Sequence, residues 1–190
     1  MKLASRLLAW SAVGVSLAAQ AESDVNTGAA PGLSAIAHLN LRVTVPRMIY
    51  LRVGSGTYFA DLATINRVTF TVPAANVGSG VATAGVPSAG AIVARVLGNG
   101  GNVSFRASGT LGGLASGANR ILWTQITPNV SGGALPHPAI GNGVAGAVTN
   151  LVAANGVVNQ IATYTFTYNN SAPVASGTYT GRVTYTASLP

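Results

Sequence analysis

Few side chains in this sequence have the chemistry needed for acid–base catalysis. The 190-residue chain contains three acidic residues, two histidines and no cysteine. Glu22 and Asp24 stand near the N-terminus, so Asp61 is the one acid in the rest of the chain. Catalysis by paired carboxylates requires two acids that share one site. The inventory therefore argues against glycosidase-type chemistry, and we predict that the protein is not an enzyme.

Metal ligands and activated nucleophiles are equally scarce. His38, His137 and Asp61 are far apart in the sequence and lack the spacing of metal ligands. The absence of cysteine excludes a thiolate site and a disulfide framework. Serines are plentiful, but the sequence has no G-x-S-x-G nucleophile elbow. We therefore expect no catalytic residues, no metal and no cofactor.

The two histidines and the lone acid have ordinary structural interpretations. His137 lies between two prolines in a loop at residues 135–138, and loops are exposed by default. We interpret it as a surface-loop histidine, with an exposed ligand contact as the alternative. His38 is expected on the solvent-facing side of a strand. Asp61 follows an aromatic pair and is expected to cap a turn.

The first 21 residues have the pattern of a cleavable secretory signal peptide. Lys2 and Arg6 form a positive region, an apolar run follows at residues 7–19, and Ala19-Gln20-Ala21 is a small-x-small cleavage site. The apolar run is shorter than the roughly 20 residues that span a bilayer. The sequence thus predicts export, through a periplasm to a cell surface or beyond, and a protein that is not an integral membrane protein.

The exported chain is basic, yet its charge is dispersed. Without Lys2 and Arg6 it has eight arginines against three acids. Charges on outer strand faces discourage edge-to-edge aggregation, which accounts for most of these arginines. Attraction to anionic polysaccharide or lipid headgroups is an alternative. Nucleic acid is not expected as a partner, because there is no basic cluster with interleaved aromatic residues.

Period-two alternation of apolar and polar residues recurs along the chain and predicts β-strands. Residues 22–35 lack it and are interpreted as a flexible N-terminal arm. The segments at 92–97 and 103–107 flank a Gly/Asn turn and are interpreted as a hairpin. Residues 144–158 are compatible with either a short helix or a strand of small residues. The predicted strands are residues 36–45, 48–53, 65–72, 92–97, 103–107, 120–127, 161–168 and 178–188.

These strands and their turns predict an all-β protein. Long Gly/Ala-rich connections separate the strands, and no window has sustained helical periodicity. We expect a single immunoglobulin-like or pilin-like antiparallel β-sandwich over residues 36–190.

The terminal segments resemble bacterial fimbrial subunits of the chaperone–usher kind, in particular the cysteine-free colonisation-factor type. The resemblance rests on the opening LNLRVTVP and MIYLRVG and on the closing SGTYTGRVTYTAS. The closing segment is also similar to the last strand of WxL-type cell-surface domains, but Trp123 is followed here by Thr-Gln.

The resemblance implies a structural subunit of a surface filament, or fimbria, that assembles by donating a β-strand to the next copy or to a related subunit. A periplasmic chaperone and an outer-membrane usher are the further partners it implies. Residues 36–45 would be the donor strand, and residues 22–34 the linker. The donated side chains would be Leu39, Leu41, Val43 and Val45, and the acceptor groove would be lined by Tyr179, Val183 and Tyr185.

Two alternatives remain at this point. Residues 36–45 have the same alternation whether they are donated or pair within their own domain. The alternative to a filament subunit is a monomeric secreted or periplasmic β-sandwich module. It would bind a glycan or another cell-surface ligand through its long loops and Trp123.

Overall fold

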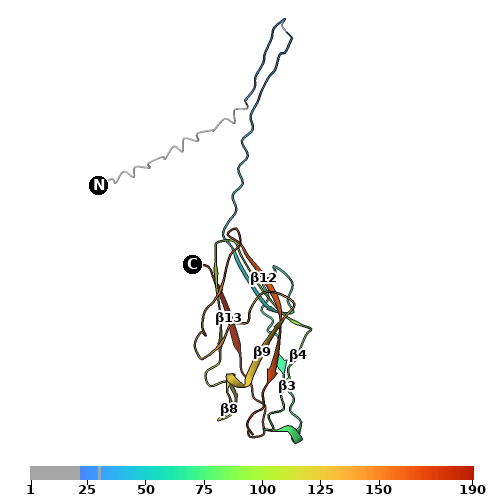
Figure 1. Cartoon of the computed structure of the whole chain (residues 1–190), viewed down its shortest axis with the longest axis vertical. Helices are drawn as coiled ribbons and strands as arrows, with labels where there is room; N and C mark the ends of the chain where they lie inside the picture. Colours follow the sequence, from blue (N-terminus) through green and yellow to red (C-terminus); the bar gives the residue numbers. More distant parts are fainter. Residues whose placement is uncertain (1–21, 30) are drawn as a thin grey trace, which may run out of the picture. The chain divides into compact units, whose positions relative to one another are not determined.

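The computed structural model of the chain describes residues 22–29 and 31–190 (Figure 1). The predicted signal peptide, residues 1–21, lies outside this part. The chain divides into one unit that ends at Val45 and a second, compact unit, Pro46–Pro190. The domain expected over residues 36–190 therefore begins at Pro46 in the structure.

The compact unit is built from strands, which confirms the all-β class. Its first sheet has five strands, and every pair in it is antiparallel. The order is β1, β5, β12 and β3, with β9 paired to the second half of β12. The strands are β1 (Ile49–Gly54), β3 (Thr83–Ala84), β5 (Ile92–Gly98), β9 (Ile126–Ser131) and β12 (Val158–Tyr168).

The second sheet has four strands arranged around β6. β13 pairs with β6, and β10 and β11 each pair with β6 as well. The β10 pairing is parallel, whereas the other two are antiparallel. The strands are β6 (Val103–Gly109), β10 (Ile140–Asn142), β11 (Thr149–Leu151) and β13 (Val183–Ser188).

Short elements complete the unit. Two small ladders join β2 to β4 and β7 to β8, and two single-turn 3₁₀ helices interrupt the loops. Neither helical turn in the described chain approaches the length and apolarity of a membrane-spanning helix. The bounds are β2 (Val68–Thr69), β4 (Val86–Pro87), β7 (Leu114–Ser116), β8 (Asn119–Ile121), η1 (Ala74–Asn76) and η2 (Trp123–Gln125).

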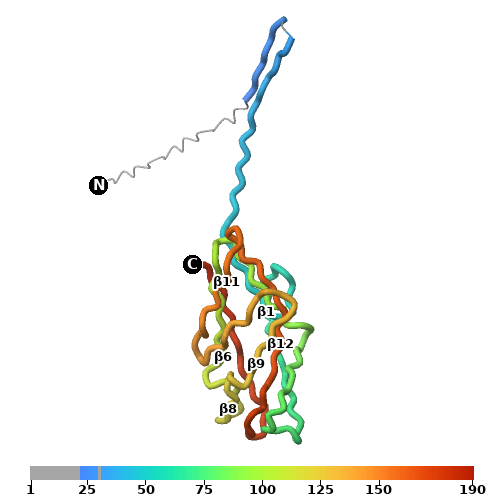
Figure 2. Tube along the Cα trace, viewed as in Figure 1, coloured from blue at the N-terminus to red at the C-terminus, as the bar shows by residue number. Residues whose placement is uncertain are grey.

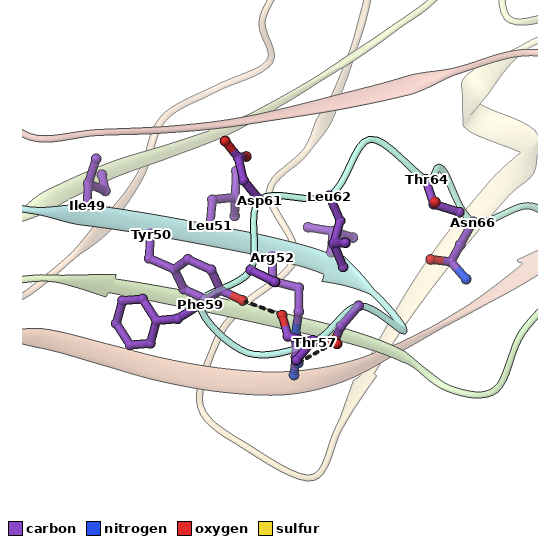
Figure 3. A pocket seen from close by; sticks show the side chains of 13 residues that line it. Ile49, Tyr50, Leu51, Arg52, Thr57, Phe59, Asp61, Leu62, Thr64 and Asn66 are labelled. Atoms are coloured by element: carbon purple, nitrogen blue, oxygen red, sulfur yellow. Dashed lines mark hydrogen bonds between the residues drawn. The ribbon is translucent and has the colours of Figure 1, made fainter.

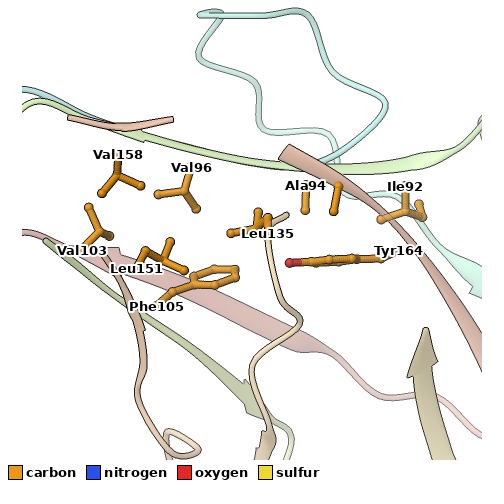
Figure 4. Packing of buried hydrophobic residues seen from close by; sticks show 10 residues of the cluster. Ile92, Ala94, Val96, Val103, Phe105, Leu135, Leu151, Val158 and Tyr164 are labelled. Atoms are coloured by element: carbon orange, nitrogen blue, oxygen red, sulfur yellow. The ribbon is translucent and has the colours of Figure 1, made fainter. Parts of the chain in front are cut away.

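The core lies between the two large sheets. Alternate residues of β5 and of β6 are buried, as period-two strands with one inward face require. Their inward side chains form one cluster with residues of β11, β12 and the loop at 135–138 (Figure 4). Burial of each large side chain there contributes about 1.5–3 kcal/mol to the stability of the folded state. The cluster includes Ile92, Ala94, Val96, Val103, Phe105, Leu135, Leu151, Val158, Ala162 and Tyr164.

The expected hairpin between residues 92–97 and 103–107 is wrong. Strands β5 and β6 belong to different sheets, and the turn between them carries the chain across the core. Asn99 in this turn accepts a hydrogen bond from the Met48 amide at 2.7 Å and donates one to the Pro46 carbonyl at 2.8 Å. The turn is therefore tied to the start of β1, and both edges of β5 are already paired, one with β1 and the other with β12.

Several predicted strands are shorter than expected. Only Val68 and Thr69 of residues 65–72 form a ladder. The expected strand at 120–127 is broken by η2 at Trp123. Residues 178–188 become a ladder only from Val183. In residues 144–158 the strand alternative is the correct one, since that segment contains β11.

Candidate functional site

Two of the strands with one unpaired edge, β1 and β13, lie close to each other. β1 pairs only with β5, and β13 pairs only with β6. Cα atoms of β1 and β13 approach within 8 Å, although the two strands belong to different sheets. The Arg47 guanidinium donates a hydrogen bond of 2.9 Å to the Pro190 carbonyl, so the start of β1 lies beside the end of β13. We call the space between these two antiparallel edges the seam.

Along the free edge of β1, the backbone N–H and C=O groups that point away from β5 belong to the residues whose side chains face the core. The Asn99 amide donates to the Met48 carbonyl, which makes this pair a hydrogen-bonded one in the β1–β5 ladder. Because such pairs alternate in antiparallel sheets, Ile49, Leu51 and Val53 direct their N–H and C=O groups away from β5. No hydrogen bond to these groups comes from elsewhere in the described chain.

The free edge of β13 follows the same rule. The Thr110 amide donates to the Arg182 carbonyl at 3.0 Å, so the hydrogen-bonded pairs of the β13–β6 ladder fall at even-numbered residues of β13. Val183, Tyr185 and Ala187 therefore direct their backbone groups into the seam. Within residues 46–190, no other segment pairs with them. The seam is thus bordered on both sides by unpaired backbone groups.

The side chains along the seam are apolar and half-buried. Leu51 and Val53 of β1 pack against the main core cluster from one side. Tyr185, Ala187 and Leu189 pack against it from the other. The core is therefore incompletely covered along this line, and additional apolar side chains placed there would gain hydrophobic contacts.

The seam is narrower than a three-strand sheet requires. Neighbouring strands lie about 4.8 Å apart, so two strands that flank a third lie about 9.6 Å apart. The closest Cα pairs of β1 and β13 lie within 8 Å. A strand inserted between them needs the seam to widen by roughly 2 Å or more. The two edges and the core that would contact an inserted strand are already present in the fold.

A groove of about 380 Å³ lies between β1 and the loop at residues 56–66 (Figure 3). Ile49 and Leu51 line it from the strand, and Asp61 and Leu62 from the loop. The expected turn cap is not seen: no hydrogen bond joins the Asp61 carboxylate to another described residue. Asp61 is instead the one acid that borders the free edge of β1.

The expected donor residues lie outside the compact unit. Leu39, Leu41, Val43 and Val45 are 83, 85, 85 and 72 % exposed. The described part of residues 22–45 contains no ladder, so the predicted strand at 36–45 is an extended segment without a partner. No residue of the described part covers its apolar side.

The N-terminal arm turns back on this segment. The Ile36 amide donates to Asp24 at 3.2 Å, and the His38 amide donates to Glu22 at 3.1 Å. The His38 ring contacts Glu22 at 3.0 Å and is exposed, as expected. Both acids of the predicted flexible arm, residues 22–35, thus bind residues 36–38 and leave residues 39–45 free.

The expected acceptor residues divide between two places. Val183 and Tyr185 lie in β13 at the seam. Tyr179 precedes the strand and packs against a second, smaller cluster around Ile121, Ile126 and Tyr168. The strand predicted at residues 48–53 supplies the other border of the seam, a role that the sequence does not indicate. Only the proximity of β13 reveals that this strand borders the same space.

His137 is not a surface-loop histidine, so that interpretation is wrong. Its ring lies among the rings of Tyr164, Phe166 and Tyr185, at centroid distances of 4.8, 5.6 and 5.5 Å. Burial lowers the pKa of His137 to about 4. Burial also raises the pKa values of Tyr164 and Tyr185.

The loop that carries His137 packs as part of the core. Leu135 and Pro138 are fully buried, and the Tyr164 hydroxyl donates to the Pro136 carbonyl at 2.9 Å. The flanking prolines restrict the backbone, which lets a short loop insert its side chains between the sheets. The sequence signal for this was Leu135 itself, an apolar residue beside two prolines.

A second hollow, of about 290 Å³, surrounds Trp123. The indole N–H donates to the Thr110 carbonyl at 2.8 Å, and Leu122, Pro128 and Ile140 line the space. Across residues 22–29 and 31–190, no three histidine, aspartate or glutamate side chains gather as metal ligands would.

The fold and the seam define an all-β protein in which the unpaired edges of β1 and β13 lie beside half-buried apolar side chains of the core. The chain matches no protein-family model, and neither the curated proteins nor the solved structures contain a significant match to it.

Proposed function

We propose that the chain is a structural subunit of an exported surface filament, a fimbria, which assembles by β-strand donation. Residues 36–45 of one copy would enter the seam of the next. The observation that carries this proposal is that one chain has both halves of the contact. An alternating segment exposes its apolar side, and a separate unit has two unpaired edges beside its core.

The two halves agree in their chemistry. Leu39, Leu41, Val43 and Val45 share one parity, so a strand with this side turned inward would place all four against the core. They extend over about 20 Å in an extended strand, and the six-residue edges of β1 and β13 cover a similar length. The inserted backbone would pair with both edges, as in β-strand addition.

The exposed apolar surfaces require protection before assembly. Large exposed apolar patches are aggregation hazards in an isolated subunit. A periplasmic chaperone that covers the seam, and an outer-membrane usher that exchanges it for the next copy, are the partners this proposal includes. It also includes export by the signal peptide and excludes catalysis.

The proposal is tested by the assembly state of the protein expressed with its own signal peptide. The full chain is compared with a variant that lacks residues 22–45, by unheated denaturing gel electrophoresis and by electron microscopy. We expect heat-sensitive ladders and filaments from the full chain and neither from the truncated chain. A folded, soluble monomer from the full chain would contradict the proposal.

A peptide experiment separates loss of assembly from loss of folding. A synthetic peptide of residues 36–45 is added to the truncated protein, and its melting temperature is measured. We expect the peptide to raise the melting temperature, because a ligand that binds only the folded state stabilises it. The control peptide exchanges the two parities, so that Asn40, Arg42 and Thr44 take the apolar positions. Equal stabilisation by both peptides would contradict insertion into the seam.

A monomeric binding module remains the second candidate. The hollow around Trp123 favours it, because binding sites are concave and mostly apolar with a few polar groups. In this case the full chain would be a monomer in the assembly experiment, and Trp123→Ala would reduce binding to a cell-surface glycan.

A further inference from the structure

The outer face of the five-stranded sheet holds two arginines opposite each other. Arg52 of β1 and Arg95 of β5 are Cα partners in the ladder, and both lie on the face away from the core. Like charges directly opposite on neighbouring strands are destabilising. We call the surface formed by these two arginines, Tyr58, Phe59 and Asn159 the arginine face.

No carboxylate of the described chain neutralises this pair. The one ion pair within residues 22–29 and 31–190 joins His38 to Glu22. Asp61 lines the groove beside β1, but it makes no ion pair with Arg52. Two positive charges are therefore held together without an internal counter-charge, which favours an anionic ligand.

Aromatic side chains extend the arginine face. Tyr58 and Phe59 are 42 and 52 % exposed. The Arg95 guanidinium lies 4.2 Å from the centre of the Tyr58 ring. Phe59 stacks on Tyr50 at a centroid distance of 4.9 Å, on the same side of β1 as Arg52 (Figure 3). Rigid aromatic rings that stay exposed are suited to stack on the apolar side of a ligand.

The loop holds Phe59 there at a conformational cost. Phe59 has a φ of 57°, which is rare for a bulky residue. Such strain is concentrated at functional sites, where the surrounding structure maintains it. Here the surroundings are the hydrogen bonds from the Tyr50 hydroxyl to Thr57 and from Arg52 to the Gly56 carbonyl.

Hydrogen-bonding capacity remains at the arginine face. Arg95 donates to the Asn159 side chain at 3.0 Å, which orients both groups. Both Nε atoms are buried, but Nη2 of Arg52 and Nη1 of Arg95 have no hydrogen-bond partner in the described chain. Guanidinium N–H groups that are not used within the protein form charge-assisted hydrogen bonds with a carboxylate.

We propose that the arginine face binds an acidic carbohydrate, a sugar that carries carboxylate groups. The carboxylate pairs with Arg52 and Arg95, the apolar side of the sugar ring stacks on Tyr58 and Phe59, and a sugar hydroxyl binds Asn159. A peptide carboxylate lacks the ring, and a neutral sugar lacks the charge. This proposal does not rest on strand donation, because Arg52 and Arg95 lie on the outer face of the sheet, whereas the seam runs along the free edge of β1.

Three probes of matched chemistry test the proposal on the exported chain. Oligogalacturonate carries both the ring and the carboxylate, its methyl ester retains only the ring, and poly-glutamate retains only the carboxylate. We expect binding to oligogalacturonate at least about tenfold tighter than to either other probe. Equal binding of poly-glutamate would overturn the proposal, and so would equal binding of an oligonucleotide or of anionic lipid vesicles.

Charge-matched variants locate the site. Arg52→Gln and Arg95→Gln are expected to weaken binding of oligogalacturonate about tenfold or more. Arg106→Gln removes the same charge from an exposed position in β6 and is expected to change binding less than about twofold. Equal losses in all three variants would show attraction by net charge alone and would overturn the proposal.

Two further variants distinguish an effect on the binding site from an effect on folding. Arg95→Lys retains the charge but loses the fork and the planar contact with Tyr58, and we expect it to bind like Arg95→Gln. Tyr58→Leu is expected to weaken oligogalacturonate binding several-fold and to leave poly-glutamate binding unchanged. Unchanged melting temperatures verify the folds, and full binding by a folded Arg95→Lys variant would overturn the proposal.

Discussion

His137 and Tyr185 are joined by a hydrogen bond of 2.7 Å between Nε2 of the imidazole and the tyrosine hydroxyl. The bond connects the buried loop at residues 135–138 to β13, one of the two strands that border the seam. The position of the edge strand therefore depends on a neutral histidine that the sequence presents as an ordinary loop residue.

The first prediction concerns acid stability. The pKa of His137 is lowered from 6.5 to about 4 in the folded chain, so the unfolded chain binds the proton more readily. Stability is complete above about pH 6.5 and falls as the pH decreases towards 4, by about 3 kcal/mol in all. Urea unfolding at pH 7 and pH 4.5 measures this decrease.

Substitution of the two histidines provides the control for that measurement. His137→Phe removes the titrating group, so we expect a smaller difference in the free energy of unfolding between pH 7 and pH 4.5. The variant also loses the hydrogen bond to Tyr185. His38→Gln, at the exposed histidine, is expected to show the same difference in the free energy of unfolding as the parent chain. The same slope in His137→Phe and in the parent chain would contradict the prediction.

The second prediction concerns the donor segment. Val43→Asp places a charge on the apolar parity and is expected to abolish filaments, because a carboxylate would be buried against the core of the next copy. Thr44→Asp places the same charge on the opposite parity and is expected to leave assembly intact. Both variants should unfold at the temperature of the parent monomer, since residues 36–45 lie outside the compact unit. Equal assembly of the two variants, seen by electron microscopy, would argue against insertion.

The third prediction concerns Asn170, which is 1 % exposed. Its side chain accepts a hydrogen bond from the Gly78 amide at 3.0 Å and donates to the Asn76 carbonyl. Asn170→Ala leaves these buried groups unpaired, and each costs about 1–3 kcal/mol. We expect a loss of about 2 kcal/mol or more in urea unfolding. Asn129→Ala, at an exposed position, should cost less than about 0.5 kcal/mol.

The fourth prediction concerns the contact between Gly109 and Trp123. A Cβ atom added at Gly109 would overlap the indole ring. We expect Gly109→Ala to destabilise the protein by about 1–3 kcal/mol, as overpacking does. Trp123→Leu in the same chain should remove much of this effect, which a double-mutant cycle of unfolding free energies measures. Strict additivity of the two changes would contradict the contact.

The sequence was sufficient for local features, because these depend on neighbouring residues. Period-two alternation located β5, β6 and the long β12 close to their observed bounds. The scarcity of acids and the absence of cysteine limited the available chemistry without any knowledge of the fold.

Only the tertiary structure decided which edges meet. The turn at residues 99–102 has the sequence of a hairpin, yet β5 and β6 face each other across the core, because each buries its own inward row there. Residues 36–45 have the pattern of a paired strand and have no partner in the described chain. His137 is buried because Tyr164 and Tyr185, distant in sequence, enclose it. Alternation specifies which side of a strand is apolar, whereas the partner of a strand is chosen by long-range packing, which no local pattern encodes.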